Sequence, residues 1–88
     1  MANVSETLDQ RHKMYGDYRD VAKISQLIKM VFDVGNTGRM SHVQRESLDM
    51  IATKIARIAS GDPDTVDHWL DIEGYARLVR NILEREND

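Results

Sequence analysis

Four carboxylates in the second half of the chain have the types and the spacing to hold a metal ion. They are Glu46, Asp49, Asp67 and Asp71. The first two lie on a helix predicted over residues 41–60, the last two on a helix predicted over residues 63–85, and each pair falls on the flank of an apolar stripe. A short turn joins the two helices, so we expect antiparallel neighbours whose acidic flanks could face each other. Carboxylate oxygens suit a hard divalent cation such as Mg²⁺.

The same acids also fit two arrangements without a metal. They could form a solvated face in which Asp67 serves as a helix cap, or they could pair with Lys54 or Arg57. Burying several carboxylates together without a cation is costly. The Mg²⁺ hypothesis therefore depends on whether the two acidic flanks meet.

A second cluster, near the N-terminus, combines cations with aromatic rings. Its members are Arg11, Lys13, Tyr15, Tyr18, Arg19 and Lys23. The cluster spans a predicted helix start, and cations, aromatic faces and free backbone N–H groups are what a nucleotide needs for its phosphates and base. The first four residues are therefore candidates for ligand binding. The alternative is a solvated basic face with Tyr15 packed onto the other helices.

Four residues on the two C-terminal helices complete the ligand-binding candidates. Lys54 and Arg57 could neutralise phosphate charge. Trp69 and Tyr75 could stack on a base, although both also fit the core of the last helix. The sequence has no Ser-His-Asp, P-loop or Rossmann pattern, so no residue is assigned a catalytic role.

The segment DHWLDIEGYA, residues 67–76, contains a glycine in the middle of a predicted helix. Gly74 costs about 1 kcal/mol relative to alanine there, and close approach by another helix or by a ligand would explain it. His68 lies near the centre of the apolar face, so we expect it to be packed or hydrogen-bonded rather than catalytic.

Composition limits the possible classes of protein. The chain has 88 residues, a net charge of −3 and no cysteine, so we expect one small domain that self-associates. The charge argues against bulk nucleic acid as a partner. The sequence has neither a signal-peptide pattern nor a membrane-spanning apolar run, and we expect a soluble cytoplasmic protein.

The apolar spacing predicts an all-α fold, a small bundle of three main helices plus a short polar N-terminal helix. The helices are predicted over 1–14, 17–35, 41–60 and 63–85, with a tail at 86–88. Predicted core residues include Val31, Ile55 and Trp69. Gly16 is expected to take a left-handed cap, and Ser41 with Gln44 to form a capping box.

Three segments in order carry a resemblance to known families: YGD at 15–17, SLDMIATKIARI at 47–58 and DHWLDIEGYA at 67–76. Over about residues 10–83 the chain resembles a family of small helical domains of unknown function found mainly in tailed phages and prophages. It is also similar to phage nucleotide-modification-associated domains. More distantly it resembles the all-α MazG-like nucleoside triphosphate pyrophosphatases.

In the MazG-like family, a Glu-x-x-Glu motif and a later Glu-x-x-Asp motif on adjacent helices hold Mg²⁺ over a triphosphate. Glu46 and Asp49 match the first motif if Asp replaces its second Glu. Asp67 and Asp71 are four residues apart rather than three, which departs from the second motif.

These observations support three expectations about function. The first is a phage-type homo-oligomer that binds a nucleotide or a phosphorylated derivative and could hydrolyse a phosphoanhydride with Mg²⁺. The second is a non-catalytic anti-defence protein, such as a sponge that sequesters a host immune nucleotide signal. The third is an inhibitor or adaptor that binds a host protein through an exposed helix face.

Overall fold

The computed structural model describes residues 3–35 and 37–87, and within them every regular element is helical. The elements are α1 (Val4–Tyr15), α2 (Tyr18–Val34), the short 3₁₀ helix η1 (Thr37–Arg39), α3 (His42–Ser60) and α4 (Val66–Glu86). The predicted all-α class is confirmed. Outside the described residues lie residues 1–2, 36 and 88. Residues 1–2 belong to the predicted first helix, residue 36 to the loop after the helix predicted over 17–35, and residue 88 to the predicted tail.

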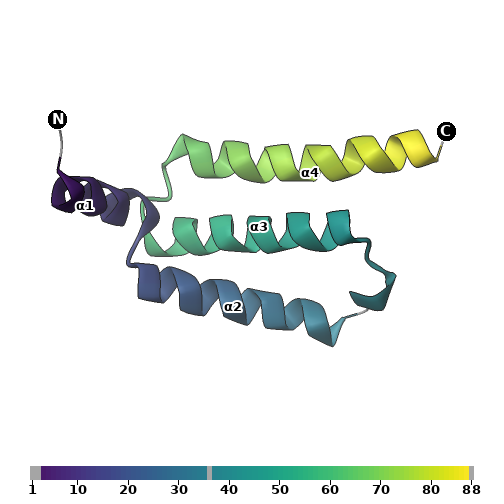
Figure 1. Cartoon of the computed structure of the whole chain (residues 1–88), viewed down its shortest axis with the longest axis horizontal. Coiled ribbons are helices and arrows are strands. Elements are labelled where there is room, and N and C mark those ends of the chain that lie inside the picture. The colour runs from purple at the N-terminus through teal and green to yellow at the C-terminus, as the bar shows by residue number, and fades with distance from the viewer. Residues whose placement is uncertain (1–2, 36, 88) are drawn as a thin grey trace.

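The three long helices lie side by side in one layer, with α3 in the middle (Figure 1). α2 and α4 pack on opposite sides of α3, and α1 lies at one end, beside the start of α2. The molecule measures 49 × 27 × 21 Å. Its radius of gyration is 15.3 Å, against about 12 Å for a compact domain of this length. The predicted bundle of three main helices and a short N-terminal helix is therefore present, with its long helices arranged as an open layer.

The core is small because α3 supplies it with small side chains. Ala52 and Ala56 are fully buried, which lets α2 and α4 approach α3 closely. A hydrogen-bonding contact of 3.3 Å joins the hydroxyls of Ser25 on α2 and Thr53 on α3. His68 of α4, only 1% exposed, is the largest fully buried side chain among the described residues.

Several residues predicted to be in the core are exposed. Val31 is 66% exposed, Ile55 is 42% exposed and Trp69 is 55% exposed. The prediction took the apolar stripe of each helix as buried. In an open layer, each outer helix packs along its length against α3 alone and α3 is packed on two sides, so part of each stripe stays in solvent.

Local signals fixed most helix ends. Ser41 and Gln44 form the predicted capping box, with reciprocal side-chain to backbone hydrogen bonds of 3.1 and 2.8 Å. α4 begins at Val66 rather than at residue 63, and Thr65 is its N-cap residue. Asp67 therefore lies in the first turn of α4, where its negative charge interacts favourably with the positive end of the helix dipole. No helix in the described part of the chain has the length and apolarity to cross a membrane.

Candidate functional site

The turn between α1 and α2 is pressed against the end of α3. Gly16 has φ 85° and ψ 177°, a combination essentially restricted to glycine, so the predicted positive φ is confirmed although the conformation is not the left-handed helical one. A Cβ on Gly16 would lie 2.5 Å from the Cβ of Ser60. Gly61 is equally close to the turn, since a Cβ there would meet the backbone nitrogen of Gly16 at 2.7 Å.

The carbonyl oxygen of Met14 ties this turn to α4. It accepts a hydrogen bond of 3.2 Å from the backbone N–H of Asp62. It also lies 3.1 Å from Nε2 of His68, a contact that places the imidazole proton on Nε2. The expectation that His68 is packed and hydrogen-bonded is confirmed, and its role is to hold the C-terminal end of α1 in place.

These contacts place the half-buried ring of Tyr15 among three other side chains. The Tyr15 and His68 ring centroids are 5.0 Å apart, with the rings tilted by 51°. The guanidinium carbon of Arg11 lies 5.0 Å from the Tyr15 ring centroid, and that of Arg57 lies 5.1 Å from it. One aromatic ring therefore attracts cations from two helices.

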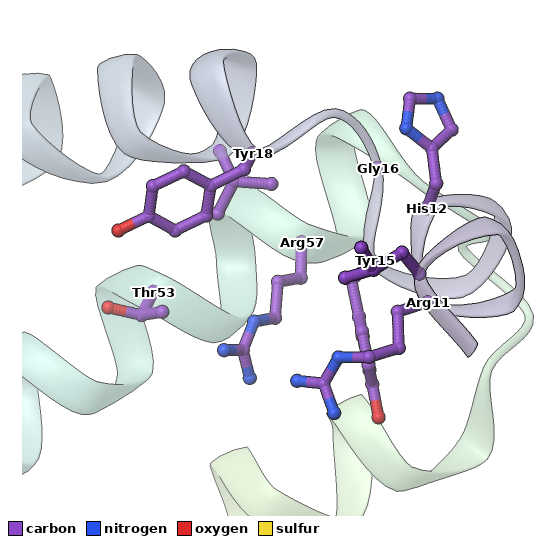
Figure 2. A pocket seen from close by; sticks show the side chains of 9 residues that line it. Arg11, His12, Tyr15, Gly16, Tyr18, Thr53 and Arg57 are labelled. Carbon is purple, nitrogen blue, oxygen red and sulfur yellow. The ribbon is translucent and has the colours of Figure 1, made fainter. Parts of the chain in front are cut away.

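A cavity of about 400 Å³ opens beside this ring, between α1, the start of α2 and the C-terminal half of α3. Figure 2 shows the guanidinium groups of Arg11 and Arg57 extending into the same region next to Tyr15. Tyr18, at the start of α2, lies at the rim and is 82% exposed. The lining residues are Leu8, Arg11, His12, Tyr15, Gly16, Tyr18, Val21, Thr53 and Arg57.

Positive charge at the cavity is not neutralised by ion pairing. Among the residues that the structure describes, neither Arg11 nor Arg57 is within ion-pair distance of a carboxylate. Asp17 is engaged elsewhere. It caps α2 through the backbone N–H of Arg19 and pairs with the side chain of Arg19 at 3.3 Å. Hydrogen bonds from that side chain and from the backbone N–H lower the pKa of Asp17. The arrangement can therefore attract an anion.

Of the eight residues predicted to bind a ligand, Arg11, Tyr15, Tyr18 and Arg57 line this one cavity. The other four lie elsewhere. Lys13 is on the exposed surface of α1. Lys54 forms a 2.9 Å ion pair with Asp71. The Trp69 indole donates a 2.8 Å hydrogen bond to the carbonyl of Pro63, and Tyr75 borders a separate groove on α4.

The structure does not bring the four predicted metal ligands together. α3 and α4 pack antiparallel as predicted (Figure 1), with Lys54 paired to Asp71, so the start of α3 faces the end of α4 and not its start. Asp49 instead accepts a 3.0 Å hydrogen bond from Arg45, while Glu46 and Asp67 are exposed.

Within residues 3–35 and 37–87, no three His, Asp or Glu side chains are grouped so that they could hold a metal ion. The donor set for the predicted Mg²⁺ is therefore not assembled within the described residues of the chain. Arg45 instead links Asp33 of α2 with Asp49 of α3 at 2.8 and 3.0 Å, and these hydrogen bonds raise the pKa of Arg45.

Sequence reasoning predicted Arg57 but missed Thr53, the other polar side chain that α3 contributes to the cavity. Thr53 lies one turn before Arg57 and lines the cavity with it. Its hydroxyl lies 3.2 Å from the carbonyl of Asp49 and 3.3 Å from the hydroxyl of Ser25. The i, i+4 spacing of Thr53 and Arg57 indicates that both side chains lie on one face of α3. Which face lines a cavity depends on where α1 packs, and the spacing does not specify that.

A comparison with known families identifies one match. The family model described as Domain of unknown function (DUF6378) matches residues 1–83. No curated protein and no solved structure matches the chain. The predicted membership in a family of small domains of unknown function is thus confirmed, while the resemblances to phage and MazG-like proteins stay predictions. Since the match spans nearly all of its length, the chain belongs to the DUF6378 family of domains of unknown function.

Proposed function

We propose that the cavity between α1, α2 and α3 binds a nucleotide or a phosphorylated nucleotide derivative. One observation carries the proposal. The guanidinium groups of Arg11 and Arg57 lie 5.0 and 5.1 Å from one Tyr15 ring at the edge of a cavity of about 400 Å³. Neither group is paired with a carboxylate in the described part of the chain.

The chemistry of these side chains favours phosphate as the anion. Two neighbouring cations repel each other, and an anion between them removes that cost. A guanidinium presents a planar fork of N–H donors that matches phosphate oxygens. Arg57 is half-buried, so its interaction with a phosphate is less screened by solvent than that of a surface lysine.

The aromatic residues at the cavity favour a ligand that carries a planar base. Tyr15 already contacts two guanidinium groups and His68. Tyr18 lies exposed at the rim, which leaves its ring available to stack on a base. Val21 and Leu8 add apolar surface to the cavity wall. We therefore assign the phosphates to the arginines and the base to Tyr18.

The proposal is for binding without an assigned reaction. The carboxylates that a MazG-like hydrolysis requires are not grouped within the described part of the chain, and none of them lines the cavity. Sequestration of a nucleotide signal, as in an anti-defence sponge, requires only binding, and the cavity offers groups for that. Phage origin enters this proposal only through the sequence resemblance.

Equilibrium dialysis against a panel of probes tests the proposal. The panel contains inorganic triphosphate, nucleoside mono- and triphosphates and cyclic dinucleotides, each with Mg²⁺. We expect retention of at least one nucleotide and its recovery intact after the protein is denatured. Retention of none would refute the proposal, and recovery of a cleaved nucleotide would show the hydrolytic alternative instead.

A further inference from the structure

The outer face of α4 carries an apolar stripe interrupted by a glycine. Leu70 and Leu78 are 58% and 57% exposed and lie one turn before and one turn after Gly74. All three border the same shallow groove. A Cβ on Gly74 would meet nothing within 4 Å, so packing inside the chain does not require a glycine that costs about 1 kcal/mol relative to alanine.

The chain also exposes more surface than a monomer of its mass. Its accessible surface is 6751 Å², whereas a monomeric protein of 10.1 kDa exposes about 5,300 Å². The excess, about 1,500 Å², exceeds the roughly 800 Å² that each partner buries in an interface of standard size. The chain therefore has enough surplus surface to form a stable dimer.

The residues of this face are arranged symmetrically about Gly74. Leu70 and Leu78 stand four positions before and after it, and Asp71 and Arg77 stand three positions before and after it. If two copies of α4 run antiparallel across a twofold axis at Gly74, each Leu70 meets the partner's Leu78. Each Asp71 likewise meets the partner's Arg77, so opposite charges face each other twice.

We propose that this face binds a second copy of the chain, with the two α4 helices antiparallel and crossing at Gly74. The absence of a side chain at Gly74 lets the two backbones approach closely, which brings the leucines on both sides into contact. α2 exposes a second apolar stripe, with Leu27 52% exposed, but α2 contains no glycine. The close backbone approach that Gly74 allows is therefore available on α4 and not on α2.

Sedimentation equilibrium of charge-reversed variants tests the antiparallel pairing. The wild-type chain is expected to be dimeric at about 100 µM. Asp71→Lys and Arg77→Asp each place like charges opposite one another, and each variant alone is expected to dissociate at least tenfold more readily. An equimolar mixture restores both attractive pairs, and we expect it to form a heterodimer with near wild-type affinity.

Two features keep this test decisive. Asp71 also pairs with Lys54, whose side chain is only 12% exposed, so Asp71→Lys brings two ammonium groups together inside the chain, and circular dichroism must show that this variant is folded before its association is measured. Leu78→Ser is expected to weaken the dimer, whereas Leu27→Ser, at a residue of similar exposure on α2, is expected to leave it intact. A wild-type monomer, or a mixture that does not reassociate, would overturn the proposal.

Discussion

The guanidinium carbon of Arg57, on the central helix α3, lies 5.1 Å from the ring centroid of Tyr15, the last residue of α1. This relationship joins the N-terminal helix to the three-helix layer at the wall of the cavity. The ring of Tyr15 also contacts Arg11 and His68. The same side chain therefore holds α1 against the other helices and forms part of the cavity wall.

Replacing Tyr15 is expected to affect stability through this ring. Tyr15→Leu removes two cation–π contacts and the contact with His68, and we expect it to lower the free energy of unfolding by about 1–2 kcal/mol. Urea denaturation measures the change. Tyr15→Phe keeps the ring and is expected to stay within about 0.5 kcal/mol of the wild type. Equal losses for both variants would mean that the hydroxyl, not the ring, matters.

Replacing Gly16 is expected to disrupt the junction between α1 and α3. Gly16→Ala places a Cβ at positive φ and 2.5 Å from the Cβ of Ser60, so we expect a loss of about 2 kcal/mol or more from the free energy of unfolding. Gly38→Ala is the matched control, because a Cβ there meets nothing within 4 Å. If the two variants have the same stability, the close contact between the turn and α3 is not needed for folding.

The cap of α2 predicts a specific dependence of stability on pH. Hydrogen bonds from the Arg19 side chain and backbone lower the pKa of Asp17 below its ordinary value of 3.8. The ionised carboxyl thus stabilises the fold above that value, and the stabilisation is lost as the pH falls through the lowered pKa. We expect Asp17→Asn to melt a few degrees below the wild type at pH 7.

The difference in melting temperature between the wild type and Asp17→Asn is expected to shrink towards zero on acidification below pH 3.8. Asp20→Asn, in the same helical turn, is the control for a general loss of charge near the start of α2. A difference that persists unchanged at the lowest pH would show that the ionisation of Asp17 does not contribute.

The sequence predicts the local features of this fold because they depend on neighbouring residues. The capping box at Ser41 and the turn at Gly16 involve groups a few positions apart. The arrangement of the helices was less predictable, since an apolar stripe does not specify how many neighbours will cover it. Trp69 illustrates this limit, because its indole finds the carbonyl of Pro63 and remains exposed instead of entering the core.

The candidate site likewise combines residues that local sequence predicts with a residue whose position depends on helix packing. Arg11, Tyr15 and Tyr18 are close in the sequence and lie together in the structure. Arg57 joins them only because the Gly16 turn packs on the end of α3. The four-carboxylate hypothesis failed although the predicted antiparallel packing of α3 and α4 is present, because Glu46 and Asp49 lie near the start of α3 and therefore face the end of α4, away from Asp67.

Isothermal titration of the chain with a nucleoside triphosphate, before and after Arg57→Gln, tests the central claim most directly. Loss of a charged hydrogen-bond donor to phosphate costs about 1.5–3 kcal/mol, so we expect Kd to rise at least tenfold. Lys13→Gln removes a cation of α1 that does not line the cavity and should leave Kd nearly unchanged. Equal affinities for the wild type and Arg57→Gln, or no binding by the wild type, would contradict the assignment of this cavity as a nucleotide site.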